Sequence, residues 1–267
     1  MKSQCPITIY IMGLGIDETY MKKYKSLTVP SRTKYVFYDQ AKEISHYDQY
    51  IENYGEKVNL VGFSMGCIVC LHLLEKFEFL IDKIILIGSP SSFYETFDIN
   101  SRVFDHDSKS QHLYSPLKYN VKKTLVFNSL FCLSKILDFL PFGTFFSKRI
   151  YRMFNPDTPN VVVDSICRTP LHKSVVQVNK HLMNSNMLSM IRKCKKTIHY
   201  VVGRDDEFAF VSIILSEHTK NSVLHICNAC NHHVFYHEPK YLHLRISAIL
   251  CDSVVWSYIN KGKSVDW

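Results

Sequence analysis

The chain has 267 residues, of which 46% are hydrophobic, 13% aromatic and 21% charged. These proportions exclude a disordered or collagen-like chain, and the length suffices to bury a full core without disulfides or metals. The formal net charge of +8 favours anionic partners. Most of the excess lies in residues 118–152, which contain no motif for reading a nucleic-acid groove, so we expect no nucleic-acid partner.

Six short runs rich in β-branched residues are predicted to be strands. Their hydrophobic residues are continuous rather than alternating, which is typical of strands covered on both faces in a parallel sheet. Helices are expected between them, most clearly at Met65–Phe77 and Pro239–Trp256. The expected fold class is α/β, a mostly parallel sheet of about six strands flanked by helices. The predicted strands are Ile7–Met12, Lys34–Tyr38, Val58–Phe63, Lys83–Gly88, Thr197–Val202 and Ser222–Cys227.

The first apolar run, Pro6 to Ile16, has about the length of a signal-peptide core. No small-residue cleavage site follows it, and its β-rich composition favours a buried strand. Nine cysteines are an odd number for a disulfide scaffold. Together these features predict a reducing compartment and a cytoplasmic location.

The segment between Pro90 and Lys196 interrupts the alternation of strands and helices. Its only strand signal is the weak run Val161–Val163, and Ser91 to about Gln111 is polar and expected to be a loop. Apolar, basic stretches with helical character follow, divided by prolines. Because both ends return to sheet strands, we expect a core of residues 1–90 and 191–267 with a helical cap, residues 91–190, inserted over a site.

The strongest motif is the G-x-S-x-G sequence from Gly62 to Gly66, which directly follows a predicted strand and precedes a predicted helix. A tight strand-to-helix turn exposes the Ser64 hydroxyl at the carboxyl edge of the sheet, and the glycines leave room for neighbouring strands. The helix amino terminus favours developing negative charge. The pattern therefore predicts a nucleophilic serine at this turn.

With this motif the chain resembles the α/β-hydrolase superfamily, in particular its cap-bearing esterases and monoacylglycerol-lipase-like members. Three further segments fit the resemblance, and they follow the first, fifth and sixth predicted strands. They are the oxyanion loop Met12–Gly15, the acid turn Gly203–Asp206 and the histidine loop Asn231–Glu238. The resemblance implies a Ser-Asp-His triad in that chain order, with no cofactor and no metal.

The resemblance also implies roles for single residues. Ser64 would be the nucleophile, and the backbone N–H groups of Leu14 and Met65 would form the oxyanion hole. Asp206 rather than Asp205 would be the acid, because the family places the aspartate three residues after the glycine of this turn. Gly62 and Gly66 would be the elbow glycines.

The histidine loop permits two registers for the catalytic base. The family glutamate lies five residues after the histidine, and counting back from Glu238 gives His233. The family proline often lies seven residues after it, and counting back from Pro239 gives His232. We predict His233, because the glutamate lies within the loop whereas one residue is easily deleted before the proline.

The C-x-x-C pair of Cys227 and Cys230 is a weak signal for metal or redox chemistry. It has no second pair to complete four ligands, so we expect no metal site there. Cysteines at the end of a strand are commonly buried as small hydrophobic residues. That interpretation is favoured for this pair.

We therefore expect a serine hydrolase that cleaves a carboxylic ester, with a small lipid-like or acyl ester as its substrate. An acyl-thioesterase and a catalytically silent ligand-binding protein of the same fold remain alternatives. The basic and aromatic residues in 118–152 would suit peripheral contact with an anionic membrane. The alternative is that these aromatic residues pack the cap while the lysines face water.

Overall fold

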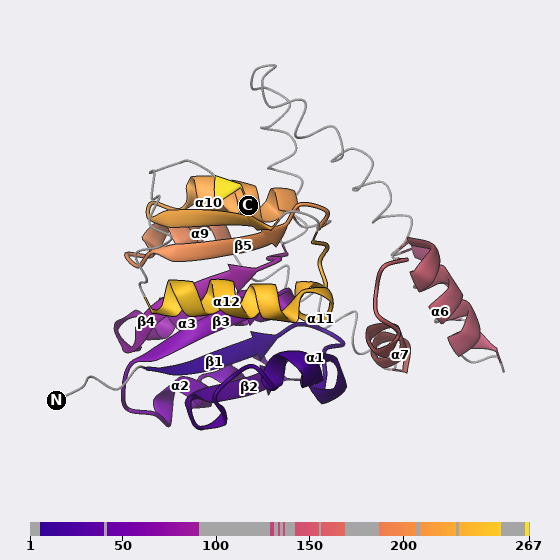
Figure 1. Cartoon of the computed structure of the whole chain (residues 1–267), viewed down its shortest axis with the longest axis horizontal. Helices are drawn as coiled ribbons and strands as arrows, with labels where there is room; N and C mark the ends of the chain where they lie inside the picture. Colours follow the sequence, from indigo (N-terminus) through magenta and orange to yellow (C-terminus); the bar gives the residue numbers. More distant parts are fainter. Residues whose placement is uncertain are drawn as a thin grey trace, which may run out of the picture.

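A computed structural model of the chain describes residues 6–39, 42–90, 129–130, 133, 136, 142–154, 156–168, 187–206, 209–227, 230–251 and 265–266. Its strands form one parallel sheet in the order β2-β1-β3-β4-β5-β6-β7 (Figure 1). The fold class and all six expected strands are confirmed, with strand ends shifted by two residues or fewer, and the two-residue β7 was not expected. The strands are β1 (Ile7–Met12), β2 (Thr33–Phe37), β3 (Val58–Phe63), β4 (Ile81–Ile87), β5 (Ile198–Gly203), β6 (Ser222–Cys227) and β7 (Val265–Asp266).

Helices cover both faces of the sheet, as the continuous hydrophobic strands predict. Alternate residues of β1 point to opposite sides, so that Ile9 and Ile11 enter one core cluster while Tyr10 and Met12 enter the other. The first cluster lies under α2 (Gln49–Glu52), α3 (Met65–Phe77), α9 (Met187–Lys193) and α10 (Ala209–His218). The second lies under α1 (Glu18–Lys25), α11 (Val234–His237) and α12 (Pro239–Leu250). Short 3-10 turns occupy Pro30–Arg32, Ile44–Tyr47 and Glu78–Leu80.

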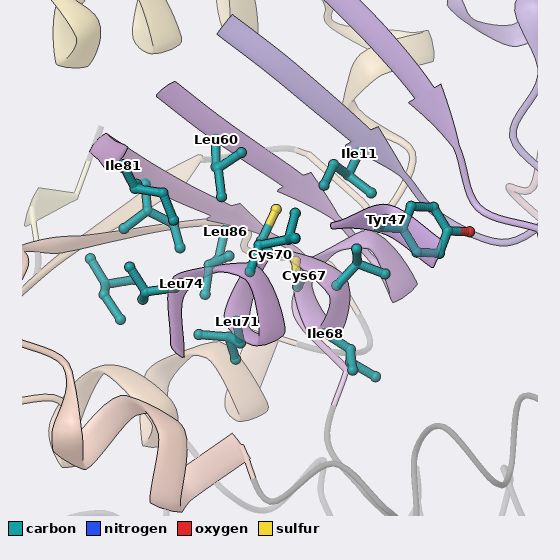
Figure 2. Packing of buried hydrophobic residues seen from close by; sticks show 14 of the residues in the cluster. Ile11, Tyr47, Leu60, Cys67, Ile68, Cys70, Leu71, Leu74, Ile81 and Leu86 are labelled. Atoms are coloured by element: carbon teal, nitrogen blue, oxygen red, sulfur yellow. The ribbon is translucent and has the colours of Figure 1, made fainter. Parts of the chain in front are cut away.

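Helix α3 is buried on nearly every side, which fixes the position of the turn at its amino terminus. Figure 2 shows Cys70 between the helix and the strands that carry Leu60 and Leu86, whereas Ile68 and Leu71 lie on the far side of the helix. The side chains on both sides are nearly inaccessible to water. Such an all-round apolar helix is typical of the interior of a layered fold.

Two helices of the expected insertion are described, α6 (Gly143–Phe154) and α7 (Asn160–Arg168). The weak strand expected at Val161–Val163 is wrong, because these residues open α7. Val163 and Cys167 are four residues apart and bury together, which is the spacing of one helix face. Figure 1 shows α6 and α7 on the side toward which the strand arrows point.

Several expectations for the insertion and the chain end lie outside the described residues. The loop expected over Ser91–Gln111, most of the cap and the chain beyond Cys251 are among them, so the division into core and cap stays a prediction. Helix α9 packs into the first core cluster through Met187 and Ile191, so the core layers include residues just before 191. Within the described ranges, no helix combines the length and the apolar character needed to cross a membrane.

Candidate active site

Ser64 stands at the turn between β3 and α3 with its backbone in a left-handed conformation, φ 52° and ψ −125°. It has the one positive φ among the described non-glycine residues. Such a conformation costs on the order of 1–3 kcal/mol and persists only where the surroundings enforce it. Here the Ser64 N–H donates to the Ile87 carbonyl at 2.9 Å, and the Ser64 carbonyl accepts from Cys67 N–H at 2.8 Å.

The two motif glycines lie where a side chain would collide with backbone. A Cβ at Gly66 would lie 1.9 Å from the Ile11 carbonyl oxygen, and one at Gly62 would lie 2.8 Å from Cys67 Cα. The start of α3 can therefore rest directly against β1 and β3. This close approach places Ser64 at the carboxyl edge of the sheet.

The loop after β1 passes directly over the serine. A Cβ at Gly13 would lie 2.7 Å from Ser64 Cβ and 3.3 Å from Ser64 Oγ. Ile16 N–H donates to the Gly13 carbonyl at 3.3 Å, which closes the loop as a turn. The expected oxyanion donors, Leu14 and Met65, thus belong to the two backbone segments that adjoin Ser64.

Asp206 is the carboxylate that the structure pairs with a histidine. Its two carboxylate oxygens each lie 3.1 Å from His232 Nδ1, and its side chain is 2% exposed, whereas Asp205 is exposed to solvent. The Asp206 N–H donates to the Gly203 carbonyl at 3.1 Å, so the glycine and the aspartate close one turn. This geometry favours Asp206 over its neighbour, as the spacing from Gly203 predicts.

The aspartate–histidine pair adjoins the serine turn through Gly88 and Phe63. Gly88 has φ +55°, and a Cβ there would lie 2.8 Å from Asp206 Oδ2 and 2.9 Å from His232 Nδ1. The His232 ring stacks on Phe63, the residue before Ser64, with centroids 5.0 Å apart. The carboxyl ends of β3, β4, β5 and β6 thereby bring the serine, the aspartate and one histidine to one edge of the sheet.

The contact with Asp206 that we expected of His233 is made by His232. His233 precedes α11, and its Nδ1 lies 3.4 Å from the Tyr20 hydroxyl in the core beside α1. Burial, together with the charges of His232 and His237, lowers the pKa of His233 to about 3. The two neighbouring rings have different partners, although their centroids are 5.5 Å apart and their planes are inclined at 75°. The spacing from Pro239 is the sequence signal that agrees with this geometry.

Residues 12–111 match the family described as "alpha/beta hydrolase fold". The chain has the α/β-hydrolase fold. No protein of the curated set matches the sequence significantly.

Solved structures share this α/β-hydrolase fold along nearly the whole chain. MenH from S. aureus superposes with a TM-score of 0.61 at 14% identity, covering 94% of this chain and 95% of that one. A carboxylesterase of the thaumarchaeon Nitrososphaera gargenis gives 0.58 at 13%, covering 93% and 92%. A bacterial membrane phospholipase A gives 0.58 at 14%, covering 96% and 81%. These identities show the fold alone.

The α/β-hydrolase loop over Ser64 gives a first testable prediction. Gly13→Ala should lower kcat by about 100-fold, because the added methyl group displaces Ser64 or the loop by a fraction of an ångström to an ångström. The measurement is steady-state hydrolysis of a chromogenic ester, with thermal unfolding to verify the fold.

Gly55→Ala is the matched control for this change. A Cβ at Gly55 meets nothing within 4 Å, although the residue has φ +61°. We expect Gly55→Ala to lower the free energy of unfolding by about 1 kcal/mol through backbone strain and to leave the turnover unchanged. Equal turnover in Gly13→Ala and Gly55→Ala would show that the β1 loop does not position the serine.

Proposed function

We propose that the chain is a serine hydrolase that cleaves a carboxylic ester, with a lipid-like or acyl ester as substrate, through Ser64, His232 and Asp206. The observation that carries the proposal is the left-handed serine turn beside a buried aspartate–histidine pair. A strained serine between a parallel strand and a helix is the arrangement that presents a hydroxyl to substrate. The family match and the carboxylesterase and phospholipase neighbours agree with this class.

The proposed reaction has two halves that share these groups. His232 removes the Ser64 hydroxyl proton as Oγ attacks the ester carbonyl, and the same proton then passes to the leaving alcohol. An acyl-enzyme ester on Ser64 remains. His232 next removes a proton from water, which attacks the acyl carbon and releases the carboxylic acid while the proton returns to Ser64. Asp206 holds the His232 tautomer and stabilises the imidazolium in both halves.

The backbone around the serine supplies the electrostatic stabilisation in this scheme. The tetrahedral oxygen would accept hydrogen bonds from the N–H groups of Leu14 and Met65. Met65 begins α3, whose amino terminus adds a positive partial charge at that point. Loss of one oxyanion donor typically costs about 3–4 kcal/mol of transition-state stabilisation.

A fluorophosphonate probe and a set of acyl substrates test the class of reaction. An ester hydrolase should label at one serine and turn over p-nitrophenyl esters, with acyl chains from acetyl to decanoyl reporting the chain preference. Matched acyl thioesters separate a thioesterase, which would hydrolyse these faster than the oxygen esters. A folded protein that neither labels nor hydrolyses would instead be a silent binding protein of this fold.

Two asparagine variants test which aspartate is the acid of the proposed triad. Asp206→Asn should lower kcat by about 10⁴-fold, because an amide facing His232 Nδ1 selects the wrong tautomer. Asp205→Asn is the matched control and should keep its turnover, since that side chain is exposed. The two variants are compared by ester kinetics, and a larger loss of turnover in Asp205→Asn would identify Asp205 as the acid of the triad.

We further propose that α6 contacts an anionic membrane surface near the site. Its buried face includes Ser147, and Tyr151 packs on Val163 and Cys167 of α7. Helix α7 in turn rests on the oxyanion loop, where a Cβ at Gly15 would lie 2.5 Å from Ile166 Cγ1. The opposite face of α6 exposes Phe145 (60%), Phe146 (49%) and Met153 (71%), with Arg149 and Arg152 among them, and Phe142 (69%) is exposed directly before the helix.

The charge and the apolar side chains of this face suit an anionic membrane surface as the partner. A helix face that combines phenylalanines with arginines suits an interface where rings insert and guanidinium groups meet anionic headgroups. The sequence alternative, in which aromatic residues pack the cap, does not describe these three exposed phenylalanines. Each arginine near the surface contributes about 1 kcal/mol, which salt screening weakens.

Vesicle flotation measures this contact. The wild type should float with phosphatidylserine-containing vesicles at low salt and much less at high salt, and the double variant Phe145→Ser/Phe146→Ser should float several-fold less. Phe79→Ser is the matched control, because Phe79 is 71% exposed but lies in the 3-10 turn between α3 and β4. Equal flotation of the α6 and Phe79 variants would contradict the contact.

A further inference from the structure

Two cysteines precede the proposed catalytic histidine in the chain. Cys227 ends β6 and Cys230 begins the histidine loop, and both thiols are free and buried, with 1% and 4% of their surfaces exposed. Their side chains hydrogen-bond to each other. The sequence alone favours the interpretation that these two cysteines are buried as small hydrophobic residues.

The surroundings of Cys227 differ from those of the other core thiols. Tyr241 and Arg245 of α12 face it, and the Arg245 guanidinium donates to the Tyr241 hydroxyl at 3.2 Å. The pKa of the Cys227 thiol is lowered, chiefly by a hydrogen bond from Cys230. A hydrogen bond from Tyr241 and the charge of Arg245 act in the same direction, and together they outweigh the effect of burial, which raises this pKa. Burial instead raises the pKa of Cys67 to about 12. A thiolate is the reactive form of cysteine.

The backbone of the cysteine pair holds the acid turn in place. Arg204 N–H donates to the Cys227 carbonyl at 2.9 Å, and Asp205 N–H donates to the Cys230 carbonyl at 3.0 Å. A Cβ at Gly203 would lie 2.2 Å from the Cys230 carbonyl oxygen, so the two segments are in contact without spare room. Asp206 directly follows Asp205, and His232 lies two residues after Cys230, and Asp206 and His232 pair with each other.

We propose that Cys227 and Cys230 are an oxidation site, at which a hydroperoxide forms a disulfide that lowers turnover at the neighbouring Asp206–His232 pair. The Cys227 thiolate attacks one oxygen of hydrogen peroxide, whose O–O bond breaks, and a proton converts the departing hydroxide to water. The Cys230 thiol then attacks the Cys227 sulfenic acid, forming the S–S bond and releasing a second water. In balance, two thiols lose two hydrogens and the peroxide is reduced to two waters.

The bond changes the geometry because a disulfide is shorter than a thiol–thiol hydrogen bond. Sulfur atoms in a disulfide are about 2.05 Å apart, with Cβ atoms about 3.8 Å apart. Closing the pair to this separation pulls the start of the histidine loop toward β6, and the acid turn follows through its two hydrogen bonds. A displacement of about 1 Å in a catalytic group can lower turnover by about 100-fold.

Peptide mapping tests the bond itself, independently of any ester hydrolysis. Trypsin cleavage after Lys220 and Lys240 gives the peptide 221–240, which holds Cys227 and Cys230 and no other cysteine. After mild peroxide treatment of the full chain, this peptide should weigh two hydrogens less and resist alkylation until dithiothreitol is added. Free thiols in this peptide, under conditions that oxidise the exposed Cys251, would overturn the proposal.

Ester kinetics test whether the disulfide lowers turnover, a consequence that rests on the proposed hydrolase function. Peroxide should lower ester turnover of the wild type at least about tenfold, with recovery in dithiothreitol. Cys230→Ser and Cys230→Ala, checked by thermal unfolding, should lose this sensitivity, whereas the control Cys251→Ser should keep it. Absence of turnover in the reduced protein would count against the proposed function. Full turnover in protein whose peptide 221–240 carries the disulfide would count against this inference alone.

Discussion

Ser64→Ala should lower ester turnover by about 10⁵–10⁶-fold and abolish covalent labelling by a fluorophosphonate probe. The reason is that no other hydroxyl is placed at the turn between β3 and α3, where the backbone of Ser64 is held left-handed and Gly13 passes over Oγ. Labelling measures the nucleophile directly, and steady-state kinetics measure the loss of turnover. The two measurements together separate a chemical loss from a loss of substrate binding.

Ser222→Ala is the matched control for this variant. Ser222 begins β6, at the opposite edge of the sheet, where its hydroxyl donates to the Ser216 carbonyl at 2.7 Å. We expect this variant to label and to turn over substrate like the wild type. Substantial turnover in a folded Ser64→Ala protein would remove the serine mechanism for this chain.

The sheet and the serine turn were predictable because their signals are local. Continuous apolar runs such as Ile84–Ile87 indicate strands covered on both faces, and the glycine spacing around Ser64 indicates a strand–turn–helix unit. The register of the histidine loop is different, because it depends on which of two adjacent rings meets Asp206 across the sheet. The other ring, that of His233, contacts Tyr20 of α1, which is far away in sequence.

The described part of the insertion shows a second limit of local patterns. Three valines from Val161 to Val163 favour a strand by composition, yet the segment is helical because Val163 and Cys167 bury as one face against Tyr151. The exposure of Phe145 and Phe146 also differs from what periodicity predicts, since Ser147 of the same helix is buried and Tyr151 is the aromatic residue that packs on Val163 and Cys167. Periodicity alone assigns the apolar face to the interior.

The two adjacent histidines should separate cleanly into a catalytic and a structural residue. His232→Gln should lower kcat by about 10⁴–10⁶-fold, because it removes the imidazole that is bonded to Asp206. His233→Gln should keep turnover within about tenfold, because a histidine with a pKa of about 3 binds a proton too weakly to serve as the base near neutral pH. Ester kinetics of the two variants, made side by side, decide the assignment.

Stability measurements provide the complementary readout for His233. Losing its contact with Tyr20 should lower the free energy of unfolding by about 1 kcal/mol, and Tyr20→Phe should cost a similar amount from the other partner. Because the folded pKa of His233 lies below the ordinary 6.5, the unfolded chain binds its proton first, and wild-type stability should fall as the pH drops from 6.5 toward 3. His233→Gln should lose less stability over that range. A larger kinetic loss in His233→Gln than in His232→Gln would restore His233 as the base, and the stacking of His232 on Phe63 would then be a packing contact.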